Sequence, residues 1–253
     1  MKKTNILAMG AMGAMLALSC AAYAQDHAEH PHWGYQGKGD PAHWADLDAA
    51  NTACKLSKEQ SPIDIEERNA KKAPLAPLAF NYAAGPAEMI NNGHTVQINL
   101  PPGSVLKAGD DSANLLQFHF HTPSEEKING VNYPMVAHFV HKSADGKLSV
   151  VAVLFKEGAE NKTLAPVFDA LPAEGKPVQL ASFNPVDVLP ANHAYFKFMG
   201  SLTTPPCSDG VRWQVLRTPV ELSKKQLAEF HKLYKMNARP VQPLNGRVVQ
   251  VSE

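Results

Sequence analysis

The chain has no excess of charge of either sign, because 24 lysine and arginine residues balance 24 aspartate and glutamate residues. Without a basic excess there is no general attraction for a nucleic-acid backbone, and no acidic tail is present either. These two absences argue against nucleic acid as a partner. They favour a small substrate over a polyanionic one.

An apolar segment long enough for a membrane-spanning helix is also lacking. The best candidate, Ile6 to Leu18, is short and rich in alanine and glycine. It follows Lys2 and Lys3 and precedes the small-x-small sequence Ala22-Tyr23-Ala24, which is typical of a secretory signal peptide over residues 1–24. We therefore expect export to the periplasm, with secretion beyond it as the alternative, and no membrane association once the signal is removed.

Cysteine is scarce, with three residues in the chain. Cys20 lies within the predicted signal peptide, where Ala17-Leu18-Ser19 makes a poor lipidation site and argues against a lipoprotein. Cys54 and Cys207 remain as an even pair in an exported protein, which predicts a disulfide. Its loop would span 153 residues, and the chain-entropy model assigns such a closure about 5 kcal/mol.

Helical spacing is rare in the rest of the chain, residues 25–253, which is long enough for one large domain. Residues 25–32 are polar and rich in histidine and predict a flexible N-terminal tail. Helices are expected only at 164–171 and at 223–236, where Ser223 and Gln226 fit a capping box. Strands are indicated by alternation or apolar runs at 95–100, 133–141, 148–156 and 211–217. The pattern predicts a single, mainly β (α+β) domain.

One predicted strand carries two histidines one residue apart. Side chains alternate between the faces of a strand, so His119 and His121 project the same way. Two imidazoles held side by side suit Zn²⁺, although two hydrogen-bonded core histidines give the same pattern. The alternation places Leu115, Gln117, His119 and His121 on one face, and Leu116, Phe118 and Phe120 on the other.

A catalytic zinc site has three protein ligands and leaves a fourth position open. The nearest candidates for the third ligand are His138 and His141. They are three residues apart, so on a strand they point to opposite faces and only one of them can bind the same ion. Spacing alone does not choose between them.

Several motifs in order resemble the α-class carbonic anhydrases of exported bacterial type. They span nearly the whole chain after the signal peptide: Trp33-Gly34-Tyr35, Gln60 to Ile65, Asn91 to His94, Gln117 to His121, Ser124-Glu125, His138 to His141, Ser201 to Pro206 and Arg239 to Arg247. The resemblance implies a large twisted, mixed but mostly antiparallel central sheet with a few short peripheral helices. It also implies reversible hydration of carbon dioxide to bicarbonate and a proton by zinc-bound hydroxide, with weak ester hydrolysis as a side activity.

The resemblance further implies roles for individual residues. His119, His121 and His138 would hold Zn²⁺, while Thr203 would donate to Glu125 and His94 would shuttle protons. The other matched positions are Thr204 for bicarbonate, Val140, Val150, Leu202 and Trp213 for carbon dioxide, Tyr35, Asn92 and Gln97 for a water chain, and Gln117 as the acceptor for His119. For the four apolar residues the alternative is ordinary core packing. Ser61-Pro62 and Pro205-Pro206 match the family's cis-proline positions.

Val136 departs from the family pattern. The resembled family usually has a glutamate at this position, which accepts a hydrogen bond from the third zinc ligand, and valine cannot accept one. We therefore expect zinc retention to be weaker, on the order of 10–100-fold, unless water or another acceptor takes the place of the glutamate. Cys207 follows Thr203 by four residues, so a bridge to Cys54 would also fix the threonine loop.

Two other classes of function compete with catalysis. A non-catalytic binding module of the same fold predicts a missing zinc ligand, whereas all three histidines are present. A periplasmic zinc-holding protein, or a catalytically impaired relative, predicts a closed site with four ligands. The resemblance implies sulfonamides and small anions as inhibitors, and a monomer or homodimer.

Overall fold

The computed structural model describes residues 32–253 of the chain. The predicted signal peptide and the predicted tail lie outside the described residues, except for His32. Within 32–253, no helix is both long and apolar enough to cross a membrane.

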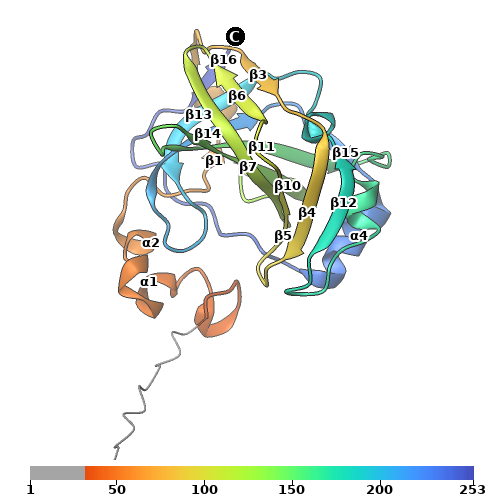
Figure 1. The fold of residues 1–253 in the computed structure, drawn as a ribbon. Helices are drawn as coiled ribbons and strands as arrows, with labels where there is room; N and C mark the ends of the chain where they lie inside the picture. Colours follow the sequence, from red (N-terminus) through yellow and green to blue (C-terminus); the bar gives the residue numbers. More distant parts are fainter. Residues whose placement is uncertain (1–31) are drawn as a thin grey trace, which may run out of the picture.

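A 13-stranded mixed sheet dominates the described part of the chain (Figure 1). The main path runs β12 (Val178–Phe183), β4 (Gly85–Asn91), β5 (Val96–Asn99), β7 (Asp111–His121), β10 (Met135–Ser143), β11 (Leu148–Glu157), β14 (Asp209–Leu216), β13 (Tyr195–Ser201), β16 (Gln250–Ser252) and β2 (Lys71–Ala73). Strands β11 and β14 pair in parallel, as do β16 and β2, and β11 with β15 (Val220–Leu222). The other pairs in this sheet are antiparallel. The predicted mixed, mostly antiparallel sheet is confirmed.

Shorter strands extend the sheet or lie apart from it. Strand β15 (Val220–Leu222) pairs with β11, while β3 (Leu78–Asn81) pairs with β6 (Val105–Ala108), which continues to β7. A separate three-stranded sheet contains β1 (Asp64–Ile65), β8 (Lys127–Ile128) and β9 (Val131–Asn132).

Helices are few and short, as expected. The longest in the described region is α4 (Lys224–Leu233), which begins with the predicted capping box of Ser223 and Gln226 and buries Leu227 and Phe230. The other helix expected from the sequence is a single turn, α3 (Ala165–Phe168). The remaining turns are α1 (Trp44–Leu47), α2 (Ala53–Leu56) and the 3₁₀ turns Gly37–Gly39, Ala49–Asn51, Glu67–Asn69 and Pro185–Val188.

The central strands bury side chains on both faces. Phe118, Phe120 and Phe139 belong to one apolar cluster, whereas Val136 and Trp213 belong to another. A strand that is covered on both sides reads as a nearly continuous apolar run, which is the pattern of β10 and β11. Polar side chains on these strands therefore need a specific partner.

A β-bulge shifts the alternation within β7. Opposite it on β10, Val140 pairs with Gln117 but the next residue, His141, pairs with Leu115, so Leu116 is the extra residue. The predicted faces are correct from Gln117 onward and wrong before it. Leu115 is buried with the phenylalanines, while Leu116 is 43% exposed.

The N-terminal part of the described chain packs around the disulfide. Cys54 and Cys207 are bonded, as predicted, and cluster with Trp44, Trp33 and Tyr35. The two predicted cis peptide bonds, Ser61–Pro62 and Pro205–Pro206, are both present. A third, Thr122–Pro123, was not expected.

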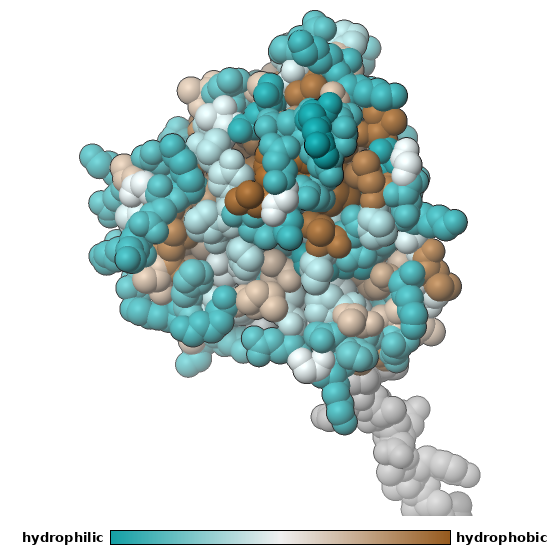
Figure 2. All heavy atoms as spheres, turned by 180° about the vertical axis from the view of Figure 1, so that it is seen from behind, coloured by the Kyte–Doolittle hydropathy of each residue, from teal (hydrophilic) through white to brown (hydrophobic). Residues whose placement is uncertain are grey.

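The surface is predominantly polar on the side opposite to the view of Figure 1. Figure 2 shows hydrophilic residues over most of that face, with hydrophobic residues interspersed among them.

Candidate metal centre

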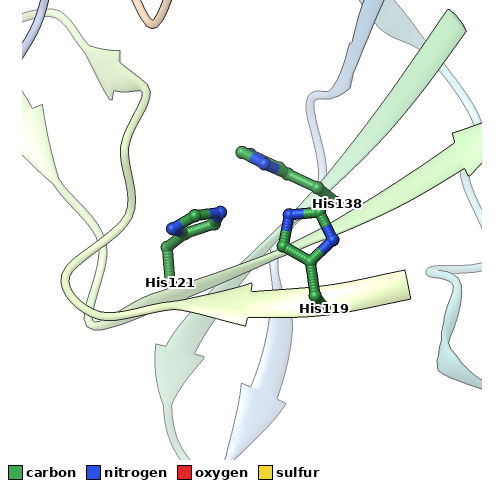
Figure 3. Close-up of side chains that lie close together, drawn as sticks. All are labelled: His119, His121 and His138. Atoms are coloured by element: carbon green, nitrogen blue, oxygen red, sulfur yellow. The ribbon is translucent and has the colours of Figure 1, made fainter. Parts of the chain in front are cut away.

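Three histidines from neighbouring strands point toward a common centre (Figure 3). His119 and His121 come from β7, and His138 comes from β10 directly opposite His119 in the strand register. Their candidate ligand atoms lie within 4.8 Å of one another. The pleat places all three rings on one face of the sheet, as the alternation predicted for the first two.

Each ring has one nitrogen occupied by a hydrogen-bond acceptor. The pairs are His119 Nδ1 with Gln117 Oε1 at 2.8 Å, His121 Nδ1 with the Asn237 carbonyl at 2.7 Å, and His138 Nε2 with Glu126 Oε1 at 3.0 Å and Oε2 at 3.2 Å. An acceptor on one nitrogen requires the proton there, so the other nitrogen keeps its lone pair. The free set is then Nε2 of His119, Nε2 of His121 and Nδ1 of His138.

The buried lone pairs fit a metal ion. His121 Nε2 is buried and has no hydrogen-bond partner among the described residues. Burial, together with the nearby His138, lowers the pKa of His119 to about 3 and that of His121 well below its usual value. Both rings are therefore neutral near pH 7, which is the state that binds metals. Three imidazole nitrogens suit Zn²⁺ with one open position.

His138 differs from the other two rings in its electrostatic surroundings. Burial lowers its pKa, but the carboxylates of Glu126 and Glu125 outweigh burial and raise the pKa overall. A cation at the centre would compete directly with this proton.

The faces of β10 distinguish His138 from His141, the two candidates for the third ligand that spacing alone did not separate. His138 lies on the face with the other two ligands, whereas His141 lies on the opposite face, where its Nε2 is 2.6 Å from Tyr82 Oη. His141 is thus a buried histidine that serves packing and hydrogen bonding.

Contacts around the histidines confirm one expectation and decide between the alternatives of another. Gln117 contacts His119 as predicted. Val136 itself gives His138 no acceptor, and the alternative that another group supplies an acceptor holds. Glu126 provides one, so the reason for expecting weaker zinc retention no longer holds.

Glu125 lies beside the histidines and is buried. Its Oε1 accepts from the Arg239 backbone N–H at 2.8 Å and lies 3.5 Å from His121 Nδ1. Burial is the main cause that raises its pKa to about 7, and the Thr203 hydroxyl acts in the opposite direction. Glu125 Oε2 has no partner within hydrogen-bond distance in the described chain, so Thr203 lies near the carboxylate without closing that bond.

The four apolar residues singled out in the sequence lie together. Val140 and Val150 are direct partners across β10 and β11, and Trp213 is the partner of Val150 on β14. Leu202 packs against the same cluster. The Trp213 ring centre is 4.9 Å from that of His138, so this apolar group borders the metal centre. Thr204 lies nearby in the chain, and its carbonyl accepts from the Cys207 N–H.

His94 lies apart from the three histidines, against the N-terminal aromatics. Its ring is parallel to that of Trp33, with centroids 3.6 Å apart, and His32 stacks on it at 4.8 Å. Burial and His32 together lower the pKa of His94 to about 4. The Asn92 side chain accepts from the His94 N–H at 3.0 Å and so fixes the turn.

The other two predicted polar positions are close to the centre. Gln97 is the strand partner of His119 on β5, and its amide donates to Asn99. Tyr35 is largely buried, and its pKa is raised by burial and by the negative charge of Glu125. Gln97 thus lies beside a candidate ligand, and Tyr35 belongs to the aromatic cluster with Trp33 and Trp44.

Two contacting residues were not found from the sequence. Neither Glu126 nor Asn237 belongs to a motif singled out in the sequence. Asn237 accepts from His121 through its carbonyl and from the Thr122 N–H through its side chain, and it donates to the carbonyls of His94 and Phe120. Asn237 is buried and its polar groups are paired, so it holds the segment of His121 and the segment of His94 in place.

Three converging imidazole nitrogens on a large mixed sheet are an arrangement that could hold a metal ion, as in metalloenzymes of the three-histidine class. Comparison with known proteins makes this specific. Residues 39–253 match the model of the eukaryotic-type carbonic anhydrase family. A carbonic anhydrase from Pectobacterium carotovorum is 44% identical over 239 residues, covering 93% of this chain and 96% of that protein.

Solved structures agree. The α-carbonic anhydrase of Thermovibrio ammonificans, in complex with the inhibitor sulfanilamide, superposes with a TM-score of 0.84 at 44% identity, covering 88% of this chain and 99% of that one. The α-carbonic anhydrase of Photobacterium profundum gives a TM-score of 0.82 at 42% identity, covering 88% and 100%. The chain belongs to the α-carbonic anhydrase family and is a lyase that hydrates carbon dioxide.

Proposed function

We propose that His119, His121 and His138 hold a Zn²⁺ ion, and that this centre interconverts carbon dioxide and bicarbonate. The observation that carries the proposal is the convergence of three free imidazole nitrogens whose rings are each fixed by an acceptor on the other nitrogen. When bound, zinc would supply an activated water as the nucleophile, since neutral ligands leave the ion its full charge.

Thr203 and Glu125 orient the attacking group. Glu125 is held by the Arg239 N–H and directs its second oxygen toward no other described partner. A donor hydroxyl on Thr203 would satisfy that oxygen, which leaves the threonine oxygen free to accept from the nucleophile. The pair thus fixes the direction of a lone pair.

The apolar residues beside His138 give carbon dioxide a resting place. Val140, Val150, Leu202 and Trp213 offer no hydrogen bond, so they favour an uncharged linear molecule over water. Thr204 would help to hold bicarbonate. Proton release would go along a water chain held by Tyr35, Asn92 and Gln97 to His94, which is partly exposed to solvent.

Family membership supports two further proposals. Sulfonamides and small anions would compete for the open position; the Thermovibrio ammonificans enzyme is solved in complex with the inhibitor sulfanilamide. Residues 1–24 would direct the chain to the periplasm, because they combine a basic start, an apolar run and a small-residue cleavage site.

A stopped-flow assay of carbon dioxide hydration tests the function. The purified protein is measured as isolated, after zinc removal by a chelator, and after zinc is added back. We expect activity to vanish with the metal and to return with it. A zinc-loaded protein without hydration activity would instead support the zinc-holding alternative.

A further inference from the structure

Glu126 is a charged residue that is 0% exposed. A carboxylate removed from water needs a strong partner, because its burial alone is costly. The partner here is His138 Nε2, which lies 3.0 and 3.2 Å from the two carboxylate oxygens. The hydrogen bond from the His138 ring is therefore the interaction that offsets the free-energy cost of burying this carboxylate.

The backbone holds Glu126 in place. The Ser124 hydroxyl donates to the Glu126 carbonyl at 2.7 Å and accepts from the Tyr133 N–H at 2.9 Å. The next residue, Lys127, begins β8, and its N–H donates to the Ile63 carbonyl. A side chain carried by such a fixed segment can set the rotation of the ring it contacts.

Position 136 cannot perform this task in the present chain. Val136 shares the strand face of His138, is fully buried, and packs in an apolar cluster. Its direct partners across the strands are His121 and Leu154. An apolar residue therefore fills the strand position. The carboxylate that contacts His138 belongs instead to a loop residue, Glu126, 12 residues before His138 in the chain.

We propose that Glu126 is the positioning residue for the third metal ligand, a task moved from strand position 136 to loop position 126. The inference rests on the proposed zinc site. It also gives the Glu125-Glu126 dipeptide two tasks. Glu125 lies near Thr203, 3.5 Å from His121 Nδ1 and 3.8 Å from His138 Nδ1, whereas Glu126 accepts the hydrogen bond from His138 Nε2. The Glu125-Glu126 segment would therefore orient the Thr203 hydroxyl and also fix the ring of the zinc ligand His138.

The test measures zinc affinity by competition with a chelator. We expect Glu126→Ala to lower the affinity roughly 10–100-fold, and Glu126→Gln to lower it less because an amide oxygen still accepts. Adding Val136→Glu to Glu126→Ala returns a carboxylate from the strand and recovers most of the loss. The matched control is Asn132→Ala, which removes a hydrogen bond to the Ser124 carbonyl in the same loop and leaves the carboxylate in place.

A second readout monitors the His138 ring itself. Imidazole NMR of the zinc-loaded protein detects the Nε2–H proton, and its resonance should move in both Glu126 variants and stay unchanged in Asn132→Ala. Equal zinc affinity and an unmoved resonance in Glu126→Gln overturn the proposal, and this variant decides if Glu126→Ala does not fold. An equal loss of affinity in Asn132→Ala also overturns it, since the cause would then be loop order.

Failure of the proposed function gives a different result. A zinc-loaded wild-type protein without hydration activity would refute catalysis while leaving the affinity comparison intact. An active wild-type protein whose zinc affinity does not depend on position 126 would refute only the role of Glu126.

Discussion

The His94 imidazole lies flat against the Trp33 indole, with ring centroids 3.6 Å apart and planes within 5°. His32 stacks on the same imidazole at 4.8 Å. In this position the pKa of His94 is about 4, lowered first by burial and then by His32. A base with that pKa accepts a proton weakly near neutral pH, so the stacked ring is a poor proton acceptor until it leaves Trp33.

Removal of the indole should restore the basicity of His94. We expect Trp33→Ala to raise the pKa of His94 toward 6.5, because burial is the larger cause of its depression. His32→Ala should raise it by a smaller amount, since it removes only the charge repulsion. Titration of the His94 ring protons by NMR measures both shifts, and a larger shift in His32→Ala would contradict this ranking.

His138 and His141 form a natural pair for comparing metal binding with packing. Both are buried on β10, but they lie on opposite faces. His138→Ala should abolish stoichiometric zinc binding and carbon dioxide hydration. His141→Ala should keep the zinc and instead lower the free energy of unfolding by roughly 1–3 kcal/mol, because the Tyr82 hydroxyl loses its partner.

Zinc content by elemental analysis and urea denaturation distinguish the two outcomes for this pair. Loss of zinc from the His141 variant while it remains folded would contradict the assignment of its face.

Glu125 should make the metal-free protein less stable as the pH rises. Its pKa is about 7 when folded, above the usual 4.5, so the folded state releases this proton later than the unfolded state. Its contribution is fully present below pH 4.5 and is lost as the pH rises through 7. Glu125→Gln removes this titration, so the variant should gain stability relative to wild type between about pH 4.5 and 7.5, by about 3 kcal/mol at most.

Urea denaturation of both metal-free proteins at the two pH values measures that difference in unfolding free energy. A difference that does not change with pH would show that the Glu125 carboxyl is already ionised in the folded protein at the lower pH.

The disulfide should affect both stability and the threonine loop. The double variant Cys54→Ser, Cys207→Ser should lose about 2–5 kcal/mol of unfolding free energy, because the closed loop no longer restricts the unfolded chain. Since Cys207 follows Thr203 closely, hydration activity should also fall in molecules that remain folded. The assay is run in buffer where circular dichroism shows the native state, and full activity there would limit the bridge to stability.

Simple alternation, capping rules and cysteine counting were enough to predict part of the fold and the site. They gave the shared strand face of His119 and His121, the helix beginning at Ser223 and the cysteine pairing, and the structure has all three. The faces of Leu115 and Leu116 were wrong because one extra residue in a ladder reverses the alternation, and nothing local marks that residue.

A second limit of prediction from the sequence concerns the groups that accept hydrogen bonds from the three ligand histidines. Alternation placed Gln117 on the strand face of His119, and the family resemblance implied that it accepts from that ring. Glu126 and Asn237 contact their histidines across 12 and 116 residues of chain, so only tertiary folding brings them together. The choice of His138 over His141 needed the family resemblance for the same reason.

The positions of Asn237 and Arg239 in the sequence decide when the metal centre can be completed during synthesis. His121 and Glu125 make hydrogen bonds to backbone groups that lie 116 and 114 residues later in the chain. A ribosome makes the chain from its N-terminus, so the three histidines all emerge long before these two groups exist. A nascent chain that stops short of Asn237 has every metal ligand but no acceptor for His121. The metal centre is therefore completed only after 116 further residues have been added beyond His121 and 114 beyond Glu125.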